Sequence, residues 1–184
     1  MIYAISGKRK SGKSTAALEL QKLAEVKFIN LEIFSFAGTL KDDFSKVMGV
    51  DRSLLDHPTY KEEYREGMQT FGEKMRSQDP MYWIKKFDKL TKKSEHIVCD
   101  DLRFFNELIY FMKKKATIIR VHADTKIRKQ RGWVLNPLID NHISETDLDM
   151  SLDTWRAIGH YCYNNRSLDE LADDLQLILN KLIR

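Results

Sequence analysis

Cysteine, proline and long apolar runs are all scarce in this chain of 184 residues. The two cysteines, Cys99 and Cys162, are too few for a disulfide framework, and their apolar and aromatic neighbours indicate buried thiols in a reducing compartment. No apolar run approaches the roughly 20 residues of a membrane-spanning helix, and the first residues show no signal-peptide pattern. We therefore expect a soluble, cytoplasmic protein that does not act at a membrane.

The sequence also lacks the patterns of several functional classes. Its 5 histidines are scattered, without the spacing of a metal site or of a Ser–His–Asp triad. With 31 Lys plus Arg against 27 Asp plus Glu, the net charge of +4 is too small to indicate a nucleic-acid polymer and suits a small polyanion. Repeats and flexible linkers are absent, so we expect one domain over residues 1–184. The oligomeric state stays open.

Hydrophobic periodicity alternates between the two kinds of secondary structure. It predicts strands at residues 2–6, 28–36, 97–99, 116–121 and 158–163, and helices at 14–25, 40–47, 60–76, 81–92, 104–115 and from 167 onward. This alternation predicts an α/β fold with a mostly parallel sheet covered by helices on both faces. Between residues 124 and 149 the pattern dissolves into polar residues around Gly132 and Pro137, which predicts a lid.

A phosphate-binding motif lies between the first strand and the first helix. It reads Gly7-Lys8-Arg9-Lys10-Ser11-Gly12-Lys13-Ser14, a complete G-x-x-x-x-G-K-[ST], and Thr15 follows it. Its glycines allow main-chain N–H groups to surround phosphate oxygens, while Lys13 reaches the β- and γ-phosphates and Ser14 holds Mg²⁺. The alternative, a chance match in a surface loop, does not explain why a strand precedes the motif. We therefore predict that residues 7–15 bind ATP.

An acidic pair follows the predicted strand at residues 97–99. P-loop enzymes place an aspartate at the end of a neighbouring strand on the magnesium side, and Asp100 and Asp101 occupy such a place. We predict that one of them contacts the metal through water. The alternative is that both cap the helix that begins near Arg103, and the two roles are compatible.

Phosphoryl transfer also needs cations, because its transition state spreads negative charge over three oxygens. We expect Lys13, Arg103 and Arg131 to be catalytic. For any single basic residue the alternative is a solvated surface charge. The other candidate cations are Lys8, Arg9 and Lys10 in the loop, Lys61, Arg65 and Arg76 on a charged helix, and Arg128 in the lid.

Several segments resemble the animal-type phosphomevalonate kinase family. Besides the loop, they are Leu54-Leu55-Asp56, Thr59-Tyr60-Lys61-Glu62, Gly72-Glu73-Lys74 with Arg76, Asp79-Pro80, Gln130-Arg131-Gly132-Trp133-Val134, Asp140, Ser144-Glu145 and Leu148-Asp149. The resemblance covers most of the chain. It implies a P-loop fold like that of nucleoside monophosphate kinases, and a reaction in which ATP phosphorylates (R)-5-phosphomevalonate to the diphosphate.

The resemblance also implies roles for individual residues. It implies that Arg128 and Arg131 contact ATP from the lid, and that the acceptor and its phosphate are bound by Lys61, Arg65, Arg76 and Arg103. We add Lys10 and Asp101 to this acceptor set. No general base is required, because a phosphomonoester with its second pKa at about 6 is already largely a dianionic nucleophile at neutral pH.

Two positions depart from the family pattern and leave alternatives open. Ser14 stands where the animal enzymes usually have Asp, and Phe104 stands where they usually have a second consecutive arginine. Segments 81–83, 101–107 and 142–145 resemble phage and viral deoxynucleoside monophosphate kinases instead. A third possibility is an ATP-dependent switch that hydrolyses ATP slowly and signals to a partner protein.

Overall fold

A parallel sheet forms the centre of the computed structural model, which describes residues 1–182 without the side chains at positions 58, 61, 62 and 182. The sheet is 5-stranded, in the order β2-β3-β1-β4-β5, and each neighbouring pair runs parallel. Its strands are β1 (Ile2–Ser6), β2 (Glu32–Phe34), β3 (Ile97–Leu102), β4 (Thr117–His122) and β5 (His160–Tyr163). The predicted α/β fold with a parallel sheet is confirmed.

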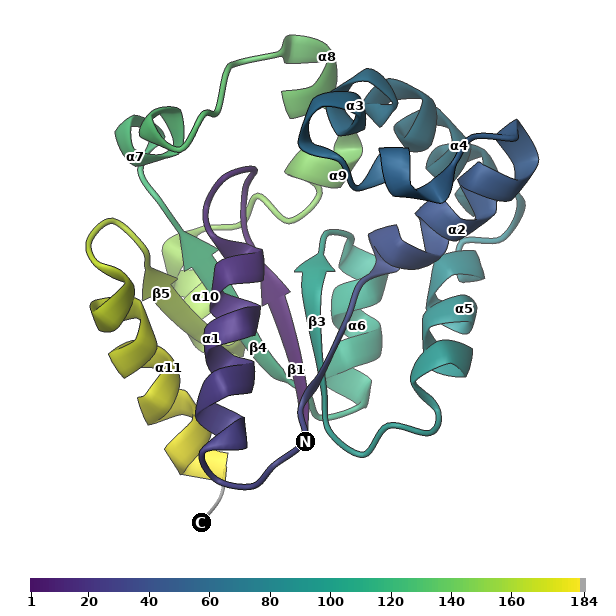
Figure 1. Ribbon diagram of the computed structural model, residues 1–184. Helices are drawn as coiled ribbons and strands as arrows, with labels where there is room; N and C mark the ends of the chain where they lie inside the picture. The colour runs from purple at the N-terminus through teal and green to yellow at the C-terminus, as the bar shows by residue number, and fades with distance from the viewer. Residues whose placement is uncertain (183–184) are drawn as a thin grey trace.

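Helices cover both faces of the sheet (Figure 1). One face packs against α1 (Lys13–Glu25) and α11 (Leu168–Leu182), and the other against α5 (Tyr82–Thr91), α6 (Phe105–Lys113) and α10 (Leu152–Ile158). Successive strand residues point to opposite faces, so Tyr3 and Ile5 join the first core while Ala4 joins the second. Because both faces are buried, most strand positions are apolar.

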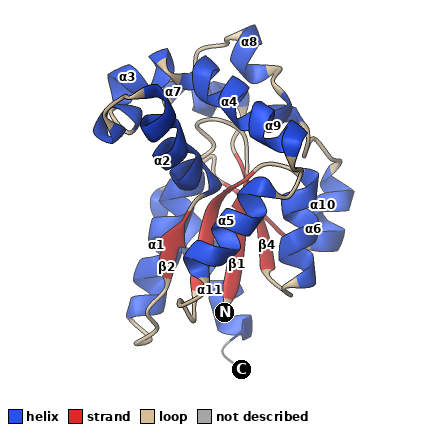
Figure 2. Ribbon diagram, turned by 90° about the vertical axis from the view of Figure 1, so that its right-hand side faces the viewer, coloured by secondary structure: helices blue, strands red, loops and turns tan. Residues whose placement is uncertain are grey.

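The remaining helices lie beyond the carboxyl ends of the strands (Figure 2). They are α2 (Phe36–Met48), the 3₁₀ turn η1 (Arg52–Leu55), α3 (Pro58–Glu63), α4 (Arg65–Gln78), α7 (Thr125–Gln130), α8 (Pro137–Asp140) and α9 (Ile143–Thr146). In open parallel sheets ligands bind outside the carboxyl ends of the strands. The fold therefore places the P-loop motif beneath a cover of helices.

Local differences from the sequence prediction have simple physical causes. The predicted strand at residues 28–36 is reduced to β2, because Phe28 turns with φ of +58° and is fully exposed. The predicted helix at residues 60–76 is divided at Tyr64 into α3 and α4. Residues 124–149 contain α7, α8 and α9, and Ile139 and Leu148 are buried. These apolar residues are too widely spaced to give a helical period in the sequence, but they anchor the segment in three dimensions.

Two expectations from composition can be compared with the structure. Cys99 and Cys162 are both free and buried, as predicted. Within the described part of the chain, no helix has the length and apolar character that crossing a membrane requires.

Candidate active site

The loop between β1 and α1 folds so tightly that two positions require glycine. Gly12 has φ of +99°, and a Cβ there would lie 2.1 Å from Nδ2 of Asn164. A Cβ at Gly7 would lie 2.4 Å from the main-chain oxygen of Val121. Glycine alone avoids these overlaps and the strain of a left-handed residue. The motif therefore forms a compact turn at the amino end of α1.

The inside of this turn offers unused hydrogen-bond donors. The N-cap residue of α1 is Gly12, which has no side chain to cap the first turn. Oγ of Ser11 is buried and likewise has no partner in the described part of the protein. Main-chain amides at the positive end of a helix attract phosphate oxygens. The segment predicted to bind ATP therefore fits a polyphosphate, with Ser14 and Thr15 exposed on the following turn.

Lys13 closes the turn from the helix side. Its Nζ donates to the main-chain oxygens of Gly7 at 2.8 Å and of Lys8 at 3.1 Å. Burial, and after it the charge of Arg103, lower the pKa of Lys13 to about 7, although nearby carboxylates act in the opposite direction. With this pKa, the amine of Lys13 is only partly protonated at neutral pH unless a further anion lies beside it. A bound phosphate would restore the positive charge of Lys13.

Ser14 and Asp100 together form the candidate magnesium site. Oγ of Ser14 donates to Oδ2 of Asp100 at 2.7 Å, so the predicted ligands from α1 and β3 lie side by side. Burial, and after it the charge of Asp101, raise the pKa of Asp100. A divalent cation would relieve this electrostatic cost, and hydroxyl and carboxylate oxygens are ligands that Mg²⁺ prefers. The two residues therefore fit a magnesium ion.

Asp101 has different partners, because adjacent residues of β3 point to opposite sides of the sheet. Its carboxylate accepts hydrogen bonds from the main-chain nitrogens of Phe36 at 2.8 Å and Ala37 at 2.7 Å, and the residue is 6% exposed. Asp101 therefore satisfies the first N–H groups of α2, not those of the helix near Arg103 that the sequence suggested. This geometry gives no support to the metal and acceptor roles predicted for it.

The cations predicted to bind the acceptor gather between β3 and α4. Arg103, which follows β3, forms an ion pair with Glu145. The guanidinium of Arg76 lies 3.7 Å from the ring centre of Phe104 and its Nη2 lies 3.7 Å from Oε1 of Glu107. Burial raises the pKa of Glu107 to about 7. Glu107 is therefore only partly ionised at neutral pH and leaves part of the charge of Arg76 for another anion.

The other predicted acceptor residues are less closely grouped. Arg65 is the first residue of α4. It is one of the cations that act on Glu145: burial alone would raise the pKa of that carboxyl, but the positive charges of Arg103, Lys13 and Arg65 outweigh burial and lower it. The backbone of Lys61 belongs to α3, but its side chain lies outside the described residues. Lys10 is exposed at the outer turn of the P-loop. Of these three candidates, Arg65 is the one that shares the neighbourhood of Glu145 with Arg103.

Arginines from the lid segment reach the back of the P-loop. Nε of Arg128 donates to the main-chain oxygen of Arg9 at 2.7 Å. Arg131, at the end of α7, donates through Nη1 to the oxygen of Ser11 at 3.3 Å and through Nη2 to the oxygen of Asn164 at 2.9 Å. Both arginines that were predicted to contact ATP therefore donate hydrogen bonds to main-chain oxygens of the P-loop, and Arg131 also donates to Asn164.

Sequence reasoning missed two residues that build this site. Asn164 is buried just after β5, and its Nδ2 donates to the oxygen of Ser11 at 2.9 Å. Arg120 donates from β4 to Oγ of Ser6 at 2.8 Å. A charged residue between apolar neighbours in a predicted strand was an available signal for Arg120. No local pattern distinguishes Asn164, whose role depends on the parallel pairing of distant strands.

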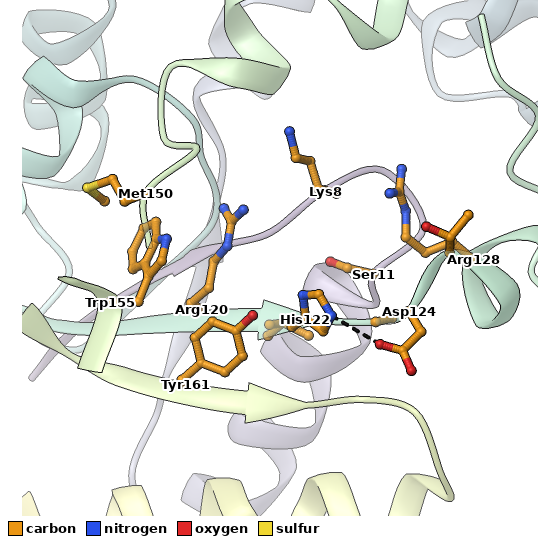
Figure 3. Close-up of a pocket in the computed structure, with 12 residues that line it drawn as sticks. Lys8, Ser11, Arg120, His122, Asp124, Arg128, Met150, Trp155 and Tyr161 are labelled. Carbon is orange, nitrogen blue, oxygen red and sulfur yellow. Dashed lines mark hydrogen bonds and ion pairs between the residues drawn. The ribbon is translucent and has the colours of Figure 1, made fainter. Parts of the chain in front are cut away.

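A cavity of about 420 Å³ opens beside the P-loop, over β4 and β5 (Figure 3). Figure 3 shows Arg120, Trp155 and Tyr161 along it, with Lys8 and Arg128 at the loop side. The guanidinium of Arg120 lies 4.8 Å from the ring centre of Trp155, and its side chain is 11% exposed. The cavity thus holds Arg120 as a further, largely enclosed positive charge near the loop.

Comparisons with known proteins agree with the fold and the motif. A family model described as phosphomevalonate kinase matches residues 5–117, which is more than half of the chain. A phosphomevalonate kinase of Drosophila melanogaster is 28% identical in an alignment that covers 96% of this chain and 94% of the relative.

Solved structures of similar architecture have low sequence identity. A gluconokinase from Sinorhizobium meliloti 1021 has a TM-score of 0.57 at 13% identity, covering 98% of this chain and 91% of that one. A shikimate kinase from Aquifex aeolicus has a TM-score of 0.51 at 14% identity, covering 100% and 98%. These likenesses show the fold alone, and they confirm the predicted P-loop α/β fold.

The separate surroundings of the two acids predict separate effects of substitution. Asp101→Asn should lower the free energy of unfolding by about 1–3 kcal/mol, because an amide cannot accept both N–H groups of α2. Asp100→Asn should instead raise the Mg²⁺ concentration needed for half-maximal activity. Thermal melts and Mg²⁺ titrations at fixed ATP check this, with each variant serving as the control for the other. A larger shift in Mg²⁺ requirement for Asp101→Asn would contradict the assignment.

The lowered pKa of Lys13 predicts proton uptake when MgATP binds. With its pKa at about 7, the amine is mostly neutral at pH 8, and phosphate oxygens that raise this pKa should draw in up to about one proton per ATP. At pH 6 the amine is already charged, so this uptake should disappear. Calorimetry in buffers of different ionisation enthalpy measures it. Lys13→Arg, which stays charged, is the control and should show no uptake at pH 8.

Proposed function

This chain belongs to the phosphomevalonate kinase family, and on that basis we propose that it transfers the γ-phosphoryl group of ATP to the phosphate of (R)-5-phosphomevalonate. The products are ADP and the 5-diphosphate. The kinase class follows from the family match together with the P-loop at the end of β1. The relative in Drosophila melanogaster, which matches nearly its full length, carries the same name.

The observation that carries the proposal is the closeness of two cationic half-sites. Lys13 belongs to the P-loop, where the donor polyphosphate fits, and Arg103 belongs to the acceptor side. Lys8 of the P-loop contacts the main-chain oxygen of Glu145 and Arg103 pairs with its carboxylate, and the charge of Arg103 contributes to the lowered pKa of Lys13. Like charges stay this close only where anions or carboxylates offset them. Two phosphate groups that react with each other meet this requirement.

In the proposed reaction one bond forms and one breaks. An oxygen of the acceptor phosphate attacks the γ-phosphorus, and the bond from that phosphorus to the oxygen it shares with the β-phosphate breaks, leaving ADP with both bonding electrons. The acceptor phosphate is largely dianionic at pH 7, so no side chain has to remove a proton. Lys13 and Arg103 hold the donor and acceptor phosphates in place and offset the charge that develops on the transferred group.

The remaining charged residues have supporting parts in the proposal. Ser14 and Asp100 would hold Mg²⁺, which neutralises charge on the β- and γ-phosphates when it is bound. Arg76 and Arg65 are proposed to take the acceptor's carboxylate or phosphate oxygens. Arg131 keeps the P-loop backbone in position and is proposed to contact ATP as the lid closes.

Location is part of the same proposal. The free, buried thiols of Cys99 and Cys162 support a cytoplasmic compartment, where disulfides are rare.

A coupled ADP-release assay tests the acceptor. We expect phosphomevalonate to give rapid, acceptor-dependent ADP release, and each of the four deoxynucleoside monophosphates to give little. Faster turnover with a deoxynucleotide would replace the proposed acceptor with the alternative kinase activity. ATPase activity that no acceptor changes would favour the switch.

Arg103→Ala should lower kcat/KM for the acceptor by about 10²–10³-fold, the usual size of one electrostatic contact to a transferring group. The KM for ATP should change much less, because the P-loop is intact. Arg156→Ala, which removes an exposed arginine of α10, is the matched control and should behave like the wild type. Initial rates at varied acceptor and varied ATP measure both effects. An unchanged acceptor kcat/KM would remove Arg103 from the acceptor site.

A further inference from the structure

The short helix α9 lies between the donor side and the acceptor side of the site. Figure 2 shows α9 beside α4, above the carboxyl ends of the strands. Nε2 of Gln69, on α4, donates to Oγ of Ser144 at 3.4 Å, and Nε2 of His142 lies 3.1 Å from Oε1 of Glu73. The main-chain nitrogen of Phe105 donates to Asp147 at 2.6 Å. These contacts attach α9 to the rigid parts around it.

Glu145 on α9 contacts a cation from each side. Its carboxylate forms the ion pair with Arg103, and the neighbouring oxygen of Ser144 accepts a second bond from Arg103 at 3.3 Å. Its main-chain oxygen accepts Nζ of Lys8 at 2.6 Å, and Lys8 also pairs with Asp149 at 2.6 Å. Glu145 therefore joins the P-loop to the acceptor arginine through one residue.

The carboxylate of Glu145 is also unusually enclosed for an acid in a lid segment. Its side chain is 3% exposed, whereas that of Asp149 is 45% exposed. An unpaired carboxylate in such a place would be costly, so the side chain is held where its partner cation lies. An arginine fixed by one buried carboxylate keeps its remaining N–H groups free for a second anion, because a guanidinium has five donors.

We propose that Glu145 is a positioning residue for phosphoryl transfer. It fixes Arg103 of the acceptor side relative to Lys8 of the donor side, so that the acceptor phosphate is aligned with the γ-phosphate of ATP. The proposal rests on the proposed function, because it assumes that Arg103 binds the acceptor phosphate. Glu145 acts through these cations and does not itself touch the transferred group. The helix α9, which belongs to the lid segment, thus becomes part of the catalytic framework.

A double-mutant cycle with Glu145→Gln and Arg103→Met tests this role. Glu145→Gln keeps the shape but removes the charge that orients Arg103, so kcat should fall by about 10-fold or more while the acceptor KM changes by less than about 3-fold. In the Arg103→Met background, adding Glu145→Gln should change kcat by less than about 2-fold, because Glu145 acts through Arg103. Asp153→Asn, which removes an exposed carboxylate of α10, controls for net charge.

Several outcomes would overturn the proposal. Losses in kcat that multiply in the double variant would show that Glu145 acts independently of Arg103. A kcat for Glu145→Gln equal to or above that of the wild type would show that the carboxylate is dispensable or competes with the acceptor. Thermal melts accompany the kinetics. If Glu145→Gln does not fold, Glu145→Asp is used: a lower kcat at unchanged melting temperature supports the role, and an unchanged kcat overturns it.

The cycle is run with whichever acceptor supports ADP release by the wild type. Failure of phosphomevalonate in the wild type would thus overturn the proposed acceptor only. A failed cycle with an active acceptor would overturn the role of Glu145 only.

Discussion

The concentration of positive charge around Lys13 is the constraint on which the rest of the site depends. Its amine is held by main-chain oxygens of its own loop, in the neighbourhood of Arg103 and Arg120, and burial with these charges lowers its pKa to about 7. Lys13, the cation proposed to bind the donor phosphates, is therefore only partly protonated at neutral pH. Negative charge brought by ATP would restore its positive charge, so the proposed binding of the donor and the ionisation of Lys13 are linked.

The protein offsets this charge with carboxylates that belong to different elements. Asp100 reaches the site from β3 and pairs with Ser14, while Glu145 reaches it from α9 and pairs with Arg103. Each carboxylate lies where a charged ligand is expected to bind in the proposed reaction. Mg²⁺ is expected beside Asp100, and the acceptor phosphate beside the arginine that Glu145 holds.

Membership of the phosphomevalonate kinase family agrees with this distribution of charge, and the departures from the family pattern can now be located. Ser14 supplies a hydroxyl where the animal enzymes usually have Asp, and the carboxylate beside it comes from Asp100. Phe104 replaces a second arginine, and the guanidinium of Arg76 packs against its ring. The acceptor side therefore keeps a cation next to the changed position, although that cation comes from α4.

The P-loop and the α/β class could be predicted from the order of the amino acids, because both depend on residues that are neighbours along the chain. The order of glycine, lysine and serine specifies the turn, and hydrophobic periodicity specifies strand and helix. Which acid faces the candidate magnesium site became clear only from the three-dimensional structure, because β3 continues past Cys99 and sends Asp100 and Asp101 to opposite sides. The contacts of Asn164, Arg120 and Glu145 likewise depend on that structure. Each of these three residues contacts a residue more than a hundred positions away, and Glu145 also contacts Arg103, 42 positions away. Only the packing of the sheet and its helices brings these residues together.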